Sequence, residues 1–151
     1  MSKIQTLEIT SLTYGGDGFG RLPDGRACFV PFSLPGEHVR VALTEEKAGH
    51  ARGRLLEILR PSPERIPARC RYFGACGGCH YQHLPYPAQL AAKERIFSEQ
   101  LSRIAGILNP PVQPIVPSPQ EWNYRNTVQF TLSPQGKPGY QAAGSHQVIE
   151  I

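Results

Sequence analysis

Three cysteines close together are the strongest chemical feature of this sequence. Cys70, Cys76 and Cys79 are spaced Cys-x5-Cys-x2-Cys in a loop rich in glycine and aromatic residues. Thiolates on such a backbone can face one metal centre, and soft sulfur donors favour an iron–sulfur cluster or zinc over magnesium or calcium. Gly74 and Gly78 can bring backbone N–H groups close to the sulfurs, where hydrogen bonds tune a metal centre. The spacing therefore predicts a metal site.

A four-ligand site needs one more donor, and the sequence offers several. Cys28 is the only other cysteine, but it lies between apolar residues of a predicted strand, where a small buried hydrophobic residue is the ordinary role. His80 and His83 could complete a zinc site of the Cys₃His type. The remaining option is a thiolate beyond Ile151. Composition alone does not decide among these donors.

The composition predicts a folded protein of the cytoplasm. Of the 151 residues, 40% are hydrophobic and 19% charged, which suits a packed core and excludes a highly charged disordered tail. Fifteen glycines and fifteen prolines argue against a helical bundle. No apolar run approaches the roughly 20 residues that cross a bilayer, and the first residues lack the apolar core of a secretion signal. We therefore expect reduced cysteines, no membrane partner and a monomer.

Residues 1–60 predict a small β-barrel. A glycine-rich turn at 14–20 and the hairpin signal Asp24-Gly25 separate short apolar segments. Val39, Val41 and Leu43 alternate with other residues, as in a half-buried strand. Five short strands in this space suit an OB-like barrel, because closure removes exposed strand edges.

The rest of the chain predicts a second and a third region. Prolines 61 and 63 mark a boundary, and residues 61–109 hold the cysteine loop and a helix that starts near Pro87. The apolar face predicted for this helix consists of Leu90, Phe97, Leu101, Ile104 and Leu108. Residues 110–151 begin as a proline-rich connector and continue in strands predicted at 124–132 and 140–151.

The overall fold class is thus mainly β with α. The last residues, 148–151, form an apolar alternating run without a turn or polar cap, which is typical of a truncated strand with an unpaired edge. We therefore interpret the sequence as the N-terminal portion of a longer protein, with residues 110–151 as the start of a β-rich domain.

Several segments resemble one enzyme family. Residues 70–90, CRYFGACGGCHYQHLPYPAQL, resemble the cluster segment of bacterial RNA (uracil-5-)-methyltransferases, which form 5-methyluridine in ribosomal RNA. The motifs GGDGFGR at 15–21 and VPFSLPGE at 30–37 resemble the TRAM domain that opens those proteins. YRNTVQF at 124–130 and the segment 139–151 resemble their central β-domain. The resemblance runs nearly end to end.

The resemblance implies a [4Fe–4S] cluster held by Cys70, Cys76 and Cys79, with a fourth cysteine shortly beyond Ile151. It also implies a parent enzyme that uses S-adenosylmethionine. In such enzymes a thiolate adds to carbon 6 of uracil, carbon 5 takes the methyl group, and a base removes the carbon-5 proton. This sequence has neither the glycine-rich cofactor loop nor the catalytic cysteine of that pattern. We therefore expect no catalytic and no S-adenosylmethionine-binding residue in it, and no activity of this part alone.

RNA, most of all 23S ribosomal RNA, is the partner that the resemblance implies, with the target base unstacked. Several polar and cationic residues on the barrel, beside the cysteines and in the third region could contact it, and as a set they favour phosphate contact. These candidates are Arg21, Arg26, Arg40, Arg52, Arg54, Arg71, Arg125 and Gln129. Tyr14 and Phe19 could stack on bases or pack in the core.

Three alternatives belong beside this interpretation. A non-enzymatic RNA-binding protein with a TRAM barrel and a zinc site would use the same residues. A transfer RNA uracil-5 methyltransferase is hard to separate from a ribosomal one by sequence. A radical methylthiotransferase also combines TRAM with a cluster, but it needs Cys-x3-Cys-x2-Cys, whereas this sequence has the longer first spacing.

Overall fold

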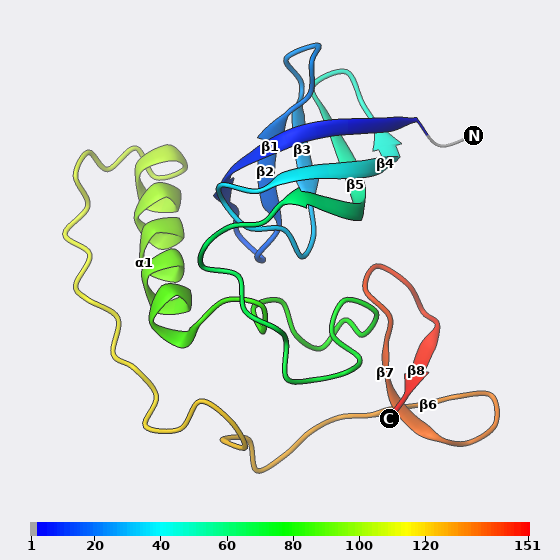
Figure 1. Ribbon diagram of the computed structural model, residues 1–151. Helices are drawn as coiled ribbons and strands as arrows, with labels where there is room; N and C mark the ends of the chain where they lie inside the picture. Colours follow the sequence, from blue (N-terminus) through cyan, green and yellow to red (C-terminus); the bar gives the residue numbers. More distant parts are fainter. Residues whose placement is uncertain (1–2) are drawn as a thin grey trace.

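A computed structural model describes residues 3–151 and consists of a closed β-barrel, one long helix and a small three-stranded sheet (Figure 1). The barrel strands are β1 (Ile4–Leu12), β2 (Gly18–Arg21), β3 (Ala27–Val30), β4 (His38–Glu46) and β5 (His50–Arg60). Helix α1 spans Tyr86–Arg103, and the second sheet contains β6 (Thr131–Leu132), β7 (Pro138–Gln141) and β8 (Val148–Glu150). The predicted class, mainly β with α, is confirmed. Within residues 3–151, α1 is too polar to cross a membrane.

The barrel closes in the order β1-β2-β3-β5-β4, and β4 pairs back onto β1. Its neighbouring strands are antiparallel except β3 and β5, which run parallel. Because every strand has two partners, this sheet has no open edge. The OB-like barrel predicted from the short alternating segments is confirmed.

Inward-facing side chains fill the barrel. Ile9, Val30, Val39 and Val41 are fully buried in its core, and Cys28 is buried among them. Burial raises the pKa of the Cys28 thiol to about 11, so this thiol stays protonated at neutral pH and is a poor nucleophile or ligand. The prediction that Cys28 is a core residue is confirmed.

Two glycines of β2 are required by the close approach of neighbouring segments. A Cβ on Gly20 would lie 2.2 Å from the carbonyl oxygen of Glu8 on β1. A Cβ on Gly18 would lie 2.1 Å from the hydroxyl oxygen of Ser33. Any side chain at these positions would push the strands apart, so the glycine-rich motif has a packing role in addition to its turn.

Helix α1 packs on the barrel through a second core. Ala92 and Ile96 of the helix are buried with Leu12, Leu34 and Leu84, which come from the barrel and from the segment before the helix. Ala92 and Ile96 are the buried residues of α1, so the buried stripe of the helix is narrow. This contact fixes α1 beside the barrel (Figure 1).

The predicted apolar face of the helix is partly wrong, although Leu90 and Leu101 are helical and half-buried. The helix ends at Arg103, so Ile104 and Leu108 lie beyond it, 79% and 88% exposed. Phe97 is 56% exposed although it is helical. A stripe of apolar residues indicates which side of a helix can be buried, but the shape of the partner surface decides which residues are.

The strand predictions for the third region are also partly wrong. Residues 124–130 form no strand, and only Thr131–Leu132 joins a sheet. The predicted strand 140–151 is divided into β7 and β8 by a turn. A strand needs a ladder partner, and within residues 3–151 the segment 124–130 has none, so its apolar side chains stay largely exposed.

Candidate nucleic-acid interface and cysteine loop

The cysteine loop, residues 70–79, carries three free thiols. Cys70 and Cys76 are partly buried, and Cys79 is exposed. The backbone N–H of Gly78 donates a hydrogen bond to Sγ of Cys76 over 3.3 Å, which is the kind of contact that tunes a metal-bound sulfur. The predicted role of the loop glycines as N–H donors therefore has one instance in the structure.

The turn between β7 and β8 braces this loop. The N–H of Gly77 donates to the carbonyl oxygen of Gln141 over 2.9 Å, and the N–H of Ala143 donates to the carbonyl oxygen of Ala75 over 3.3 Å. Cys76 thereby forms an isolated antiparallel bridge with this turn. The loop and the second sheet thus share one surface, although they lie far apart in the sequence.

The donor set of the loop suits an iron–sulfur cluster, because three soft, free sulfurs lie within ten residues and are reachable from solvent. Across residues 3–151 no three His, Cys, Asp or Glu side chains are already gathered around one point. A metal would therefore have to draw the three sulfurs together.

His83, one of the alternative zinc ligands, does not join the cysteines. Its ring is buried and lies 5.1 Å from the ring of Phe73, and neither nitrogen has a hydrogen-bond partner among the described residues. Burial and the nearby Arg65 guanidinium lower the pKa of His83 to about 4, so the ring is neutral at physiological pH. Cys28, another alternative ligand, is enclosed in the barrel core.

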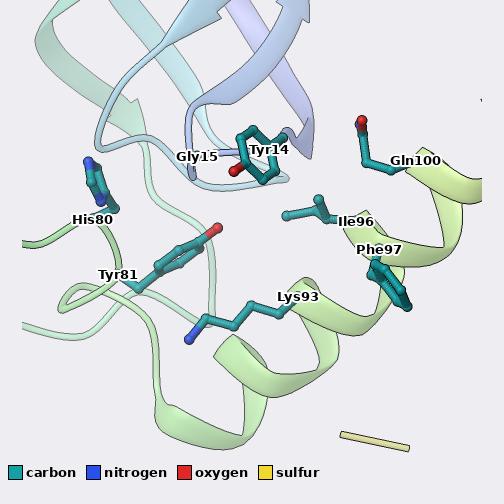
Figure 2. A pocket seen from close by; sticks show the side chains of 8 residues that line it. All are labelled: Tyr14, Gly15, His80, Tyr81, Lys93, Ile96, Phe97 and Gln100. Atoms are coloured by element: carbon teal, nitrogen blue, oxygen red, sulfur yellow. The ribbon is translucent and has the colours of Figure 1, made fainter. Parts of the chain in front are cut away.

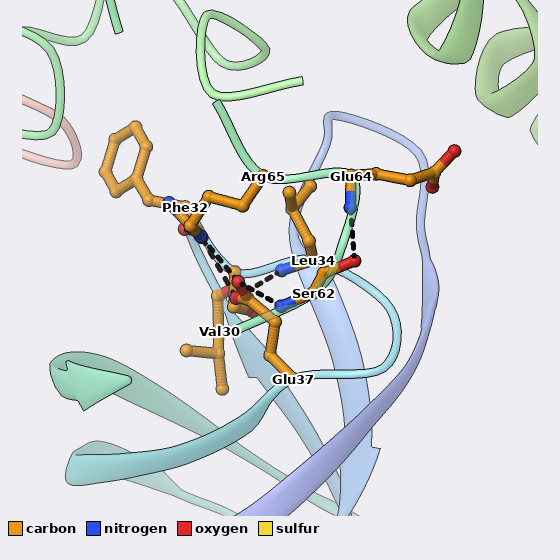
Figure 3. A network of polar contacts seen from close by, with 8 residues as sticks. Val30, Phe32, Leu34, Glu37, Ser62, Glu64 and Arg65 are labelled. Carbon is orange, nitrogen blue, oxygen red and sulfur yellow. Dashed lines mark hydrogen bonds and ion pairs between the residues drawn. The ribbon is translucent and has the colours of Figure 1, made fainter. Parts of the chain in front are cut away.

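A buried ion pair fixes the barrel to the segment that leads into the cysteine loop (Figure 3). The fully buried carboxylate of Glu37 accepts hydrogen bonds from the backbone N–H groups of Leu34 (2.9 Å) and Ser62 (3.3 Å). It also accepts from Nε and Nη2 of Arg65. Burial by itself would raise the pKa of Glu37, but the Arg65 and backbone hydrogen bonds outweigh it and hold that pKa below its usual range.

The same contacts continue toward the cysteines. Arg65 Nη2 donates to the carbonyl oxygen of Phe32 over 2.8 Å, at a residue with φ of 64°. The Phe32 ring meets the ring of Phe73 edge-on at 5.2 Å. The N–H of Ile66 donates to the carbonyl oxygen of His83 over 3.0 Å. The barrel and the cysteine loop are therefore held together by packed contacts.

A groove of about 1140 Å³ lies where the barrel, the cysteine loop and the β7–β8 turn meet. We call it the basic groove. The barrel contributes Asp17, Thr44, Arg52 and Arg54 to its lining. The cysteine loop and the residue after it contribute Gly74, Gly77 and His80, and the β7–β8 turn contributes residues 141–146. Three segments distant in sequence thus contribute to one concave surface.

Two of the predicted RNA-contacting arginines line the basic groove. Arg52 is held by Asp17, with Nη1 3.1 Å from Oδ2, and its Nε lies 3.9 Å from Oε2 of Glu45. Arg54, two residues along β5, forms no ion pair within the described residues. His146, which the β7–β8 turn contributes, also lines the groove. Arg54 therefore carries the uncompensated charge of this surface.

The remaining predicted RNA contacts lie outside the lining of this groove. Three of them are engaged on the barrel: Arg26 pairs with Asp24 and Glu46, Arg40 pairs with Glu57, and Arg21 donates to the carbonyl oxygen of Gly25. The others are Arg71, stacked 4.8 Å from the ring of Tyr72, Arg125, 5.8 Å from the ring of Tyr124, and the exposed Gln129. Their predicted contact with RNA stays a prediction.

A second groove of about 610 Å³ lies between α1 and the barrel turn at residues 13–17 (Figure 2). We call it the aromatic groove, lined by Tyr14, Gly15, His80, Tyr81, Lys93, Ile96, Phe97 and Gln100. Phe97 belongs to this exposed wall, whereas the sequence pattern placed it in the helix core. Neither of the two aromatics predicted to stack on bases or to pack in the core lies in a core: Tyr14 is 81% exposed, and the partly buried Phe19 lies 5.9 Å from Phe29 with Arg21 over its ring. Base stacking by either ring stays a prediction.

Residues 2–56 match the TRAM domain family, which confirms the resemblance of the barrel. The chain is 39% identical over 150 residues to an uncharacterized RNA methyltransferase of Gloeobacter violaceus, covering 97% of this chain and 33% of that protein. It is 38% identical over 141 residues to the 23S rRNA (uracil(1939)-C(5))-methyltransferase RlmD of Thiobacillus denitrificans, covering 93% and 32%.

A solved structure has the same arrangement. The chain aligns with the crystal structure of Pyrococcus abyssi tRNA (uracil-54, C5)-methyltransferase in complex with S-adenosyl-L-homocysteine, with a TM-score of 0.63 and 27% identity. That alignment covers 96% of this chain and 31% of the solved one, and the chain spans about a third of the length of the curated relatives it matches. The chain thus has a barrel that matches the TRAM domain family over residues 2–56 and is similar, over about a third of their length, to RNA methyltransferases.

Proposed function

We propose that this chain is the RNA-binding and cluster-binding part of an S-adenosylmethionine-dependent RNA (uracil-C5)-methyltransferase that acts as a monomer in the cytoplasm. The observation that carries the proposal is the basic groove, in which Arg52 and Arg54 of the TRAM barrel face the cysteine loop and the β7–β8 turn. Ribosomal RNA is the favoured substrate by similarity to the Thiobacillus enzyme. Transfer RNA is the second candidate, favoured by the similarity to the Pyrococcus structure.

The groove residues would bind and orient the RNA backbone. Arg54 is free to contact a phosphate, while Arg52 is held in place by Asp17 and presents its remaining N–H donors without losing much side-chain freedom. Bound S-adenosylmethionine supplies the methyl group in such reactions. The role of this chain is to fix the position of RNA around the target base, which has to leave its stack to be methylated.

We also propose that Cys70, Cys76 and Cys79 hold the [4Fe–4S] cluster. Their free thiols and the Gly78 N–H that already donates to Cys76 support this assignment. The cluster would tie the loop to the second sheet through the hydrogen bonds of Gly77 and Ala143. It would thereby stiffen one wall of the basic groove.

By itself, the 151-residue chain is expected to transfer no methyl group to RNA. Its only cysteine outside the loop, Cys28, is buried with a raised pKa, so it cannot serve as the thiolate that adds to carbon 6. Release of tritium from carbon 5 of labelled uridine in RNA measures the reaction. Tritium release by the purified chain in the presence of S-adenosylmethionine would contradict the proposal that these 151 residues bind RNA and the cluster but do not catalyse methyl transfer.

RNA binding by the basic groove is expected to depend strongly on salt, because contacts with phosphates release counterions. The substitution Arg54→Glu should weaken binding and lower the slope of log affinity against log salt by roughly 0.7–1. Arg60→Glu is the matched control, since Arg60 is an exposed residue of the same strand that pairs with Glu8 away from the groove. Fluorescence anisotropy with a labelled RNA measures both. Equal effects of the two substitutions would contradict the groove as the binding surface.

A further inference from the structure

The aromatic groove presents ring surfaces that the fold does not bury. Tyr14 is 81% exposed at the tip of the barrel turn, and Phe97 is 56% exposed on α1. Ile96 of α1 points toward Tyr14, and the half-buried Tyr81 lies across the groove on the segment before the helix (Figure 2). The groove volume, about 610 Å³, falls within the roughly 300–1,000 Å³ of small-molecule pockets, so it has room for a nucleobase.

The turn that carries Tyr14 is rigidly built. The N–H and the hydroxyl of Thr13 both donate to the carbonyl oxygen of Asp17, over 2.9 and 3.1 Å, and the N–H of Gly16 donates to the carbonyl oxygen of Thr13 over 2.9 Å. Gly15 and Gly16 have φ of 91° and 92°, a conformation that favours glycine. The turn therefore fixes the backbone position from which the exposed Tyr14 side chain projects.

The aromatic groove is also lined by a positively charged side chain, that of Lys93. Lys93 Nζ lies 5.5 Å from the centre of the Tyr81 ring, and within residues 3–151 it forms no ion pair with a carboxylate. A lysine beside an aromatic surface suits a nucleotide, because the ring can stack on the base while the ammonium contacts a phosphate. An uncharged apolar ligand would make no charged contact with Lys93.

The aromatic groove and the basic groove adjoin each other. His80 lines both, and a Cβ on Gly16 would lie 3.1 Å from Cβ of His80, so the barrel turn and this residue are in close contact. An RNA strand whose phosphates lie along Arg54 therefore reaches the aromatic groove without leaving the surface. This continuity selects RNA as the occupant over an unrelated peptide.

We propose that the aromatic groove is a stacking subsite for an unpaired nucleobase of the bound RNA, with Tyr14 as the stacking ring and Lys93 as the contact for the adjoining phosphate. The proposal rests on the proposed RNA-binding function and adds a preference for single-stranded nucleotides. Base stacking on aromatic side chains tolerates any sequence, so the subsite would bind the strand without a sequence preference.

The test compares Tyr14→Ala with Tyr14→Phe, which keeps the ring. The probe is a fluorescent oligouridylate of about 12 nucleotides, within the roughly 4–16 nucleotides that one OB fold covers. Tyr14→Ala is expected to raise its Kd by about 5- to 140-fold, the cost of one lost stacked base, while Tyr14→Phe stays within about twofold. A fully paired RNA duplex should bind both variants like the wild type, because its bases are not available for stacking.

A strand carrying 2-aminopurine gives a second readout, since its fluorescence is quenched on stacking and this quenching should be absent with Tyr14→Ala. Salt-dependent binding that responds to Arg54→Glu but is unchanged in Tyr14→Ala, with no quenching in the wild type, would overturn the subsite and leave the proposed function standing. A partner peptide would then be the better occupant. Failure of every RNA to bind the wild-type chain would overturn the proposed function itself.

Discussion

Replacing Glu37 with glutamine is expected to lower the free energy of unfolding by about 3 kcal/mol, the lower end of the range for breaking a buried ion pair from one side. The substitution removes the charge that balances Arg65, whose side chain is only 21% exposed, while the Glu37 carboxylate has no exposure at all. Urea denaturation followed by circular dichroism measures the change. Glu57→Gln is the matched control, because Glu57 pairs with Arg40 at the surface with both side chains about half exposed, and its loss should stay within about 1 kcal/mol.

The same pair gives stability a dependence on pH. The pKa of Glu37 is held below its ordinary value of 4.5 in the folded protein, so its ionisation stabilises the fold fully above about pH 4.5. This contribution is lost as the pH falls through the lower, folded-state pKa. The wild type should therefore lose more stability on acidification than Glu37→Gln does. Parallel losses in the two proteins would show that the carboxylate is not the titrating group.

Removal of one loop thiol is expected to abolish iron loading. After anaerobic reconstitution with ferrous iron and sulfide, the wild-type chain should be brown, with broad sulfur-to-iron charge-transfer absorption. Cys76→Ala should hold almost no iron, because Cys76 has the sulfur that accepts the Gly78 N–H and lies at the bridge to the β7–β8 turn. Iron and acid-labile sulfide per chain are the measurements.

Cys28→Ala is the control for that experiment, since Cys28 is enclosed in the barrel and should leave the iron content unchanged. The reconstituted cluster is expected to be sensitive to oxygen, because three thiolates leave one iron of a four-iron cluster without a cysteine from this loop. A colourless wild-type protein with stoichiometric zinc would favour the alternative of a zinc-binding RNA-binding protein.

The sequence predicted the barrel well because its signals are local. Alternating residues such as Val39 and Val41 face the core, and the turn glycines appear where the strands cross closely, as at Gly20. Each of these signals is decided by neighbours within a few residues or by one adjoining strand. The predicted burial of Cys28 follows from the same alternation.

The helix face and the grooves could not be predicted in this way. Ile96 is buried and Phe97 exposed because the surface beneath α1 selects one side of the helix, and that surface comes from Leu12 and Leu34 of the barrel. The basic groove combines β5 with the β7–β8 turn, and no pattern along the chain indicates that Arg54 and His146 line one surface. Exposure of Tyr14 depends on a turn geometry that the two glycines permit but do not dictate.

The hydrogen bond between Gly77 and Gln141 also means that the cysteine loop is synthesised well before the segment that holds it. Its hydrogen-bond partner is made 64 residues later, so at about 5–20 residues per second the ribosome needs roughly 3–13 s to supply it. During that interval the three thiols belong to a nascent segment without its later strand partner. Iron or an oxidant that arrives then meets a loop without the hydrogen bonds of Gly77 and Ala143, and one that arrives later meets a loop held beside the second sheet.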